Sequence, residues 1–396
     1  MLFGNFFVRK KNSLHQPNKS RSDFLSPLLL IPLILVSTSS LLIHSVQRQF
    51  DYSDSINHFL TGLIGYLIAI LISYIPLERL RNYIFPFYVL TLISLIAVYF
   101  FGISFYGAQR WLSVGFFTFQ PSELAKLSTI LTLAYVLDKK SISKMEDLIL
   151  PSLVMIFPWI LIFFQPDLGT SLVLIFLFFL MLYWTQVPVE WILILTFCLL
   201  TAIISSNLPP LTLFLWIPLM GYLAYRSFKK KIIFTFLVMA LHILVAKLTP
   251  FLWNVGLKDY QKDRLIIFLD PSKDPLGGGY HLLQSKIAIG SGGLLGTGIL
   301  NGKLTNLQFI PEQHTDFIFS ALGEEIGFLG SFIAILLFFT LISKLLSISK
   351  NARTDFESLV VIGITATLLF QIIINIFMTI GLGPVTGIPL PFMSYG

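Results

Sequence analysis

Asp316 lies where a long polar stretch of the sequence meets an apolar run that ends near Ile342. A carboxylate in such surroundings is costly unless it faces water, a partner or a substrate. Partial withdrawal from water makes a carboxylate hold its proton more tightly, which moves it toward the range of a general base. Asp316 is therefore the candidate catalytic residue. The structural alternative is an acid at a helix N-terminus that complements the helix macrodipole.

The spacing after Asp316 suggests a polar helix face. If a helix begins near His314, then Asp316, Ser320, Glu324 and Gly327 follow one another at intervals of four, four and three residues. Such intervals place side chains on one stripe of a helix. Small and polar residues on that stripe suit a cleft better than lipid. We therefore expect these residues to line a cleft together.

A second polar group begins at Gln120, where a helix is predicted with proline at its first turn. Glu123 and Lys126 are three residues apart, so they share a helix face and can neutralise each other. Two interpretations stay open, a buried structural ion pair and a polar lining for a charged substrate. Arg110, next to Trp111, is either an interfacial anchor or a bidentate phosphate ligand.

The hexapeptide QPDLGT, residues 165–170, separates two apolar runs with a proline and a glycine, as expected where a membrane helix turns back. Asp167 in this turn either caps the next helix or has a functional role. The glycine-rich run 290–298 lacks the spacing of a phosphate-binding loop, so it predicts tight turns and close backbone packing. His281 and His314 lack further ligand spacing, so no zinc site is expected.

These residues must be positioned by membrane helices. The sequence is 55% hydrophobic and 12% charged, with a mean hydropathy of +0.82. Those values predict an all-α polytopic integral membrane protein. About eleven transmembrane segments are visible, at residues 26–45, 57–76, 84–101, 121–137, 149–164, 168–187, 190–205, 209–225, 232–249, 314–342 and 358–380.

Cations in the connections predict the sidedness. The N-terminal tail, residues 1–24, is basic, and alternate later connections are rich in lysine and arginine. By the positive-inside bias these parts face the cytoplasm. The long loop 251–313 and Asp316 are then extracytoplasmic. Residues 25–396 form one transmembrane domain, because spans bury their faces only against one another. The odd number of crossings before a Gly/Pro-rich end suggests a truncated chain.

Several long motifs, in this order, resemble the SEDS family (shape, elongation, division and sporulation), the elongation type more than the division type. They are GAQRWLSVGFFTFQPSELAKL (107–127), QPDLGT, RLIIFLDPSKDPLGGGYHLLQSKIAIGSGGLLGTG (264–298), FIPEQHTDFIFSALGEEIGFLG (309–330) and PLPFMSYG (389–396). The resemblance covers nearly the whole chain except about 190–250. It implies a ten-helix core, so two helices within 190–250 are a predicted insertion and the last family helix is missing.

The resemblance implies a peptidoglycan polymerase of the bacterial plasma membrane that joins lipid II units into β-1,4 glycan strands. Asp316 matches the essential aspartate, which would take the proton from the acceptor 4-hydroxyl. Arg110, Lys126 and Arg264 are candidates for the charge of the leaving diphosphate. Glu123 and Lys126 match family positions that position substrate, and Gln120 and His314 complete the predicted substrate-binding set.

The resemblance also implies a class B penicillin-binding protein as partner, beside lipid II and membrane lipid, and no nucleic acid. It gives no certain cofactor and leaves room for a divalent cation, Mg²⁺ or Mn²⁺. Three other functions remain open from the sequence: a lipid II flippase, a proton-coupled transporter using Glu123 and Asp167, and a non-catalytic scaffold for a wall transpeptidase.

Overall fold

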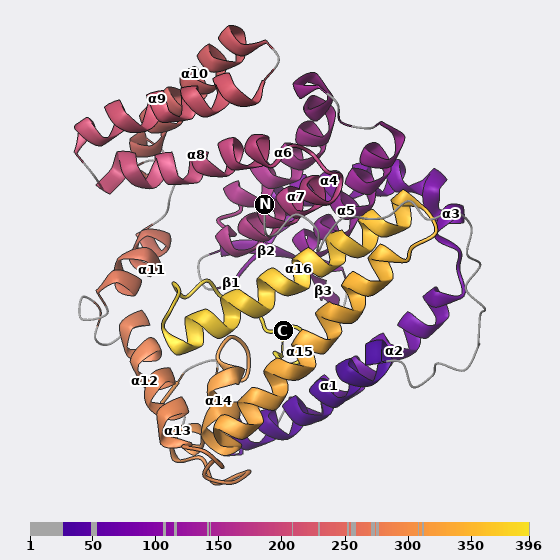
Figure 1. Cartoon of the computed structure of the whole chain (residues 1–396). Helices are drawn as coiled ribbons and strands as arrows, with labels where there is room; N and C mark the ends of the chain where they lie inside the picture. The colour runs from indigo at the N-terminus through magenta and orange to yellow at the C-terminus, as the bar shows by residue number, and fades with distance from the viewer. Residues whose placement is uncertain are drawn as a thin grey trace.

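The computed structural model describes residues 27–48, 54–105, 108–114, 117–140, 142, 144–207, 209–228, 230–251, 253–254, 259–270, 274, 277–307, 309–310 and 313–395. The predicted cytoplasmic tail, residues 1–24, lies outside these ranges. Long helices occupy all the predicted apolar segments (Figure 1). They are α1 (Pro27–Val46), α2 (Ser55–Ser73), α4 (Ile84–Phe101), α5 (Pro121–Lys139), α6 (Ile149–Phe164), α7 (Leu168–Trp184), α8 (Val189–Asn207), α9 (Pro210–Ser227), α10 (Lys231–Phe251), α15 (Gly327–Lys350) and α16 (Asp355–Ile380).

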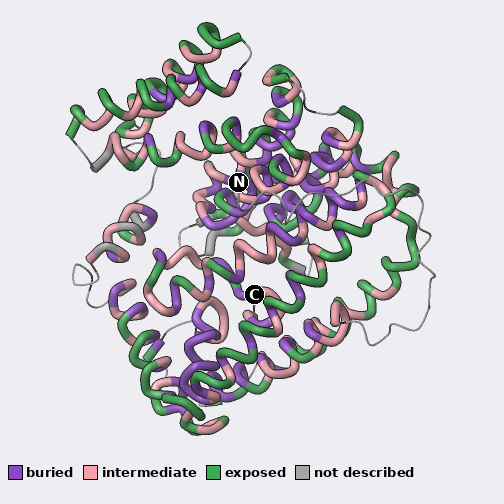
Figure 2. Tube along the Cα trace, in the orientation of Figure 1, coloured by how far each residue is buried: buried purple, intermediate pink, exposed green. Residues whose placement is uncertain are grey.

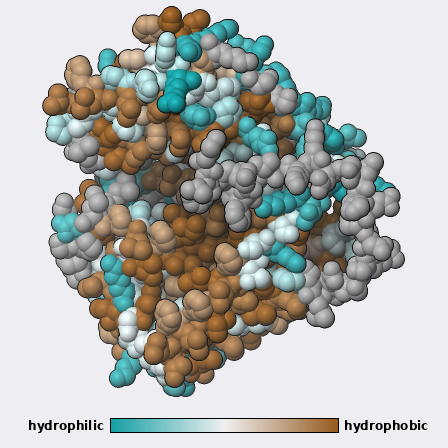
Figure 3. Space-filling view, viewed as in Figure 1, coloured by the Kyte–Doolittle hydropathy of each residue, from teal (hydrophilic) through white to brown (hydrophobic). Residues whose placement is uncertain are grey.

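Among the described residues, seven spans are long and apolar enough to cross a membrane, and two shorter apolar helices, α7 and most of α8, accompany them. The all-α polytopic class is confirmed. Figure 3 shows hydrophobic residues over most of the face above α15 and α16, as expected of helices in contact with lipid tails.

Short elements connect the long helices. Two are four-residue α-helices, α3 (Leu77–Leu80) and α13 (Lys303–Asn306), and two are 3₁₀ turns, Arg81–Tyr83 and Met145–Leu148. The segment after α4 forms an antiparallel sheet of three strands in the order β1 (Ile103–Phe105), β2 (Ala108–Val114), β3 (Phe117–Phe119). The register pairs Ile103 with Trp111 and Leu112 with Phe119. This sheet is a local addition to the helical fold, and it delivers Arg110 to the start of α5.

Two large buried clusters, and a small third one of Ala288, Ile310 and Phe317, hold the described residues together. One joins α4 to α10 with α16, and it includes fully buried Leu95, Leu133 and Leu177. The other joins α1, α14 (Ile318–Glu325), α15, α16 and the C-terminal segment 381–395, through residues such as Ile43 and Met393. Figure 2 shows buried residues concentrated in these two places, while α2 is exposed along most of its length. Because α16 belongs to both clusters, it links the two halves of the fold.

The helices α8, α9 and α10 pack mainly on one another, and α8 contacts α7. Figure 1 shows α9 and α10 at the edge of the molecule, away from α14 to α16. Inside this group the Thr201 hydroxyl lies 2.6 Å from His242 Nδ1 and accepts a hydrogen bond from Trp216 Nε1 at 2.9 Å. The three predicted helical segments between 190 and 250 are therefore present. Their status as an insertion stays a prediction.

The predicted loop 251–313 contains helices of its own, α11 (Asp259–Leu269), α12 (Gly278–Ser291) and α13. The glycine-rich run after α12 packs against the end of α14, where Thr297 N and Gly298 N donate to the carbonyls of Glu324 and Glu325 at 2.9 and 3.0 Å. A Cβ on Gly296 would lie 2.1 Å from the Glu325 carbonyl oxygen. The prediction of tight turns and close backbone packing is confirmed.

The same packing corrects the predicted continuous span 314–342. Residues 313–317 form turns, α14 ends at Glu325, and α15 begins at Gly327 and continues to Lys350. Gly327 has a φ of +75°, a conformation in which L-residues with a side chain are strained. The backbone N–H groups of Phe328 and Leu329 donate to Gly293 and Leu294 at 2.9 and 3.1 Å, so contacts with a distant loop replace the helical ladder at this point.

Candidate functional site

Asp167 is the centre of the first polar group. Its carboxylate caps α7, accepting hydrogen bonds from Thr170 N at 3.2 Å and Thr170 Oγ1 at 2.9 Å. Gln120 Nε2 donates to the same carboxylate at 3.1 Å, and Arg110 Nη1 lies 3.8 Å from it. The capping role is confirmed, and the turn at 165–170 also holds two of the predicted substrate-binding residues.

Arg110 faces inward. Its guanidinium donates to the carbonyl of Pro166 as well as approaching Asp167. The interpretation as an interfacial anchor that points to the lipid head groups is therefore not the one observed. Arg110 therefore lies between the Pro166 carbonyl and the Asp167 carboxylate at the start of α7.

The first turns of α5 carry the predicted ion pair. Lys126 Nζ lies 2.8 Å from Glu123 Oε2, with the Lys126 side chain buried and that of Glu123 54% exposed. On the buried face of the same helix, the hydroxyls of Ser122 and Thr129 find no hydrogen-bond partner among the described residues. Buried hydroxyls without a partner are unusual in a close-packed core. Both interpretations of the Glu123–Lys126 pair, a structural ion pair and a polar lining for a substrate, stay predictions.

Asp316 is partly exposed and belongs to the turns before α14, not to a helix beginning at His314. The predicted cleft-facing stripe is therefore wrong. Ser320 is fully buried and donates to Phe317 O at 2.7 Å. Glu324 is 1% exposed and accepts from Leu304 N, Thr305 N and Thr305 Oγ1 at 2.8, 2.9 and 2.7 Å. Glu324 thus fixes α13 to α14 and does not share a cleft with Asp316.

The C-terminal segment 381–395 surrounds the turn that carries Asp316. Tyr395 N donates to His314 O at 3.1 Å, and the rings of His314 and Tyr395 are 6.1 Å apart. At the other side, Asn375 Nδ2 of α16 donates to Asp316 O at 2.9 Å. The backbone of the predicted catalytic turn is therefore held on two sides by residues from the last part of the chain.

Arg264, on α11, meets Asp316 beside Gly387. The guanidinium donates to Thr386 O at 2.8 Å. A Cβ built on Gly387 would lie 3.4 Å from Asp316 Oδ2, 3.5 Å from Arg264 Nη1 and 3.7 Å from Arg264 Nη2. Gly387 has a φ of +72°, so glycine suits the turn, and the missing side chain leaves space between the acid and the cation.

The two polar groups are joined where α7 begins. A Cβ on Gly169 would lie 2.9 Å from Ile388 Cγ1 and 3.5 Å from Thr386 O. The turn that holds Arg110 and Gln120 is thus packed directly against the segment that holds Arg264 and flanks Asp316. The candidate site that we assemble from these contacts draws on β2, α5, the α6–α7 turn, α11, the turn before α14 and the C-terminal segment. A base beside a cation at such a place can deprotonate a hydroxyl and stabilise a departing anion.

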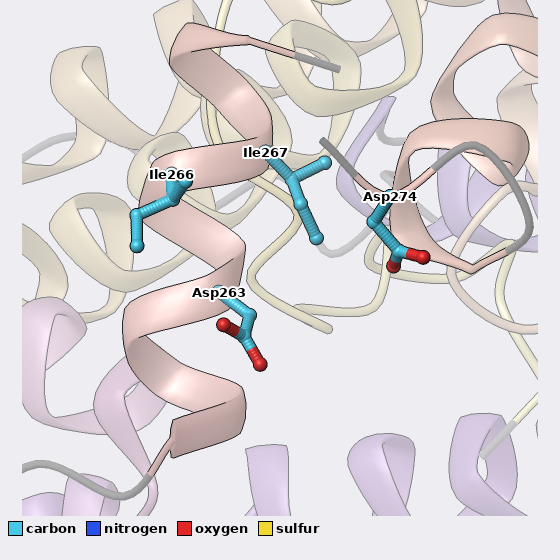
Figure 4. A pocket seen from close by; sticks show the side chains of 4 residues that line it. All are labelled: Asp263, Ile266, Ile267 and Asp274. Carbon is cyan, nitrogen blue, oxygen red and sulfur yellow. The ribbon is translucent and has the colours of Figure 1, made fainter. Parts of the chain in front are cut away.

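A cavity of about 330 Å³ lies between α11 and the segment before α12, lined by Asp263, Ile266, Ile267 and Asp274 (Figure 4). Asp274 accepts hydrogen bonds from Gly277 N and Gly278 N at 3.0 and 2.8 Å, so it caps α12. Burial lowers the pKa of His281, on the next turn of α12, and the charge of Asp274 opposes that shift. None of the predicted site residues lines this cavity.

Within the described ranges, no group of three or more His, Cys, Asp or Glu residues is arranged to hold a metal ion. The residues around Asp316 therefore do not form a recognisable divalent-cation site by themselves.

Two contributors were missed by the sequence analysis. Asn375 and the carbonyl of Thr386 were not considered, although both touch the predicted site. Asn375 had a readable signal, since it is an amide inside the apolar run IIINIFM of α16. Polar side chains within membrane helices are rare and are often functional. The Thr386 carbonyl could not be predicted from the sequence, because every residue has a backbone carbonyl.

A family model described as FTSW_RODA_SPOVE, cell cycle protein, matches residues 22–237 and 211–396. The chain belongs to this family, the SEDS family. The two matched ranges overlap at residues 211–237, which lie in α9 and α10 inside the predicted insertion. Membership confirms the resemblance found in the sequence motifs.

Several curated SEDS relatives match most of the chain. Peptidoglycan glycosyltransferase MrdB of Escherichia coli K12 is 36% identical over 377 residues, covering 93% of this chain and 87% of the relative. Peptidoglycan glycosyltransferase RodA of Treponema pallidum is 32% identical and covers 95% and 94%. A probable FtsW of Wigglesworthia glossinidia brevipalpis is 31% identical and covers 93% and 86%. The elongation-type assignment is consistent with these matches.

Solved structures agree with the fold. A chain from a structure described as structural coordination of polymerization and crosslinking by a peptidoglycan synthase complex has a TM-score of 0.71 and 26% identity, covering 93% of this chain and 91% of its own. The crystal structure of Thermus thermophilus RodA gives a TM-score of 0.57 at 23% identity, covering 93% and 89%. The second likeness supports the SEDS fold alone.

Proposed function

We propose that this SEDS protein is a peptidoglycan glycosyltransferase that polymerises lipid II into β-1,4 glycan strands for cell-wall elongation. The observation that carries the proposal is the meeting of the Asp316 carboxylate and the Arg264 guanidinium beside Gly387. That geometry occurs in a chain whose curated relatives are named peptidoglycan glycosyltransferases.

Asp316 acts as the general base in this proposal. It takes the proton of the acceptor sugar 4-hydroxyl while that oxygen attacks the donor anomeric carbon from the face opposite the leaving group. The bond from the anomeric carbon to the diphosphate oxygen breaks, so the α-linked donor gives a β-linked product. Negative charge grows on the leaving diphosphate, and fixed cations near that position lower the barrier.

We assign the diphosphate to Arg264, because this cation lies beside the proposed base. Its guanidinium is held by the Thr386 carbonyl, a neutral acceptor, beside the acid. Each of the three candidate cations has a carboxylate close by: Asp316 for Arg264, Asp167 for Arg110 and Glu123 for Lys126. We assign Arg110, Gln120, Glu123 and Lys126 to holding the polar part of the substrate, together with His314. A divalent cation bound with the diphosphate would add positive charge at the leaving group.

The basic connections support an orientation in the bacterial plasma membrane with the N-terminus in the cytoplasm and Asp316 outside. At that depth the diphosphate of a polyprenyl-linked donor lies near the head groups while its tail stays in the bilayer. We infer that a class B penicillin-binding protein is the partner, because crosslinking must follow polymerisation and a structural neighbour comes from a complex that couples both.

Strand synthesis from lipid II tests this proposal. The purified full chain in detergent is given lipid II, with and without the partner transpeptidase, and products are separated by gel. We expect glycan ladders from the wild type and none from Asp316→Asn at equal protein amounts. A flippase or a proton-coupled transporter would make no polymer in detergent, and a scaffold would tolerate Asp316→Asn. Absence of polymer with the wild type in both conditions would overturn the proposal.

A further inference from the structure

Asn375 is an amide in the last third of the apolar helix α16 (Asp355–Ile380), and it is completely buried. Burying an amide in apolar surroundings is costly unless its groups are hydrogen-bonded. α16 packs against α5, α7, α12 and α14, and Asn375 lies where this helix meets the turn that carries Asp316. The contacts of the amide identify its role.

The amino group of Asn375 makes two hydrogen bonds, both to backbone carbonyls. Nδ2 donates to Asp316 O at 2.9 Å and to Ile388 O at 2.8 Å. Two carbonyl acceptors require the donor end of the amide, so the orientation of the side chain follows from chemistry. The acceptors belong to segments 72 positions apart in the numbering, the turn before α14 and the C-terminal segment. One side chain therefore ties these two segments together.

Each tied segment holds one of the charged groups. The turn before α14 holds the carboxylate of Asp316. Ile388 lies two residues after Thr386, whose carbonyl receives the hydrogen bond of Arg264, and one residue after Gly387, where the two charged groups meet. Fixing the carbonyls of residues 316 and 388 to one amino group therefore fixes the acid relative to the anchor of the cation.

The carbonyl end of the Asn375 amide differs from its amino end. Asn375 Oδ1 is buried and accepts no hydrogen bond from the described residues. An unsatisfied buried acceptor lowers stability, and an apolar residue of the same shape avoids that penalty. A residue kept only for packing would not need this amide. Its two donated bonds are the feature that an apolar residue cannot supply.

We propose that Asn375 is a positioning residue that sets Asp316 against Arg264 by holding the carbonyls of residues 316 and 388 on one amino group. Its catalytic consequence rests on the proposed glycosyl transfer. Asn375 does not bind substrate in this account, so its loss acts on kcat more than on KM. Displacement of a base by about 1 Å costs on the order of 100-fold in rate.

The kinetic test uses Asn375→Leu, which keeps the size but removes both donors, and Asn375→Ser, which keeps one donor. The matched control is Thr379→Val on the same helix, since the buried Thr379 hydroxyl donates to Ile376 O within α16. We expect Asn375→Leu to lower kcat for lipid II about 100-fold with KM within about threefold of wild type. Asn375→Ser should lose about tenfold, and Thr379→Val should stay within about threefold.

A second readout needs no activity. In a Cys198→Ser background, Asp316→Cys is labelled with a water-soluble maleimide, with and without Asn375→Leu. We expect the labelling rate to change at least about threefold when Asn375 is replaced, because the turn is no longer held. Wild-type strand synthesis measured in parallel separates the two claims. Failure of the wild type would remove the proposed function, whereas labelling would still decide the positioning.

The inference is overturned if a folded Asn375→Leu variant keeps kcat within about threefold of wild type, or if its labelling rate at position 316 is unchanged. Folding is checked by the thermal unfolding midpoint of the detergent-solubilised protein. If Asn375→Leu fails to fold, Asn375→Ser takes its place in both assays. A wild-type kcat in that variant would equally overturn the inference.

Discussion

Gly169 and Ile388 are packed so closely that a side chain on the glycine would lie 2.9 Å from Ile388 Cγ1. They are far apart in the sequence, yet each borders one half of the candidate site. Gly169 follows Asp167, which gathers Arg110 and Gln120, and Ile388 follows Gly387, where Arg264 and Asp316 meet. The contact packs the two halves of the candidate site directly against each other.

Enlarging Gly169 should therefore impair activity without touching a polar residue. We expect Gly169→Ala to lower kcat several-fold and Gly169→Val about 100-fold, because the added atoms push residues 386–388 away from α7. Gly65→Ala in α2 is the control, since nothing lies within 4 Å of its Cβ position. Equal rates of strand synthesis by Gly169→Val and Gly65→Ala in the gel assay would show that the packing of Gly169 on Ile388 does not affect catalysis.

Arg264 should be intolerant of lysine. The guanidinium can hold the Thr386 carbonyl and still present other N–H groups to a diphosphate, whereas an ammonium is a point charge on a flexible stem. We expect Arg264→Lys to lose about tenfold and Arg264→Gln about 100-fold in kcat/KM for lipid II. Both variants should be present in the membrane at wild-type amounts. Full activity of Arg264→Gln would remove this residue from the mechanism.

Glu324 should matter for stability. Its buried carboxylate accepts three hydrogen bonds from the start of α13, and removal leaves those donors without a partner. We expect Glu324→Ala to lower the free energy of unfolding by about 3 kcal/mol. Glu78→Ala, at an exposed position of α3, should change it by less than about 0.5 kcal/mol. Thermal unfolding in detergent compares the two, and similar midpoints would contradict the structural role given to Glu324.

His281 should make stability depend on pH. Burial lowers its pKa in the folded state below the ordinary value of 6.5, so below that pH the unfolded chain binds more protons than the folded chain. Stability contributed by the neutral ring is complete above pH 6.5 and is lost as the pH falls toward the lowered pKa. We expect His281→Gln to show a smaller fall in unfolding midpoint between pH 7 and pH 5 than the wild type. An equal fall in the unfolding midpoint of the two proteins between pH 7 and pH 5 would contradict this role of His281.

The sequence predicted the spans and the polar motifs well, because apolar length and runs such as QPDLGT report local requirements of a membrane helix and of a turn. It failed where distant segments decide the local structure. The break between α14 and α15 depends on the loop 293–298, which supplies the backbone bonds that the helix gives up. The prediction of one helical stripe from Asp316 to Gly327 assumed a continuous helix, without backbone hydrogen bonds to a distant loop.

The candidate site was predicted in composition but not in arrangement. Asp316, Arg264, Arg110 and Gln120 were all named, yet nothing in their spacing placed Arg264 beside Asp316 or joined Arg110 to Asp167. Those relationships come from tertiary packing of α11, α16 and the C-terminal segment. They depend on backbone carbonyls and on glycine, features that a list of chemically active side chains leaves out.

The most direct test of the central claim is the rate of glycan strand synthesis from purified lipid II by Asp316→Asn, compared with wild type at equal amounts of folded protein. A general base contributes about 100-fold to 10,000-fold, so we predict a loss of at least 100-fold. Thermal unfolding midpoints of the two proteins should agree within a few degrees. A folded Asp316→Asn variant that makes glycan strands at the wild-type rate would contradict the account.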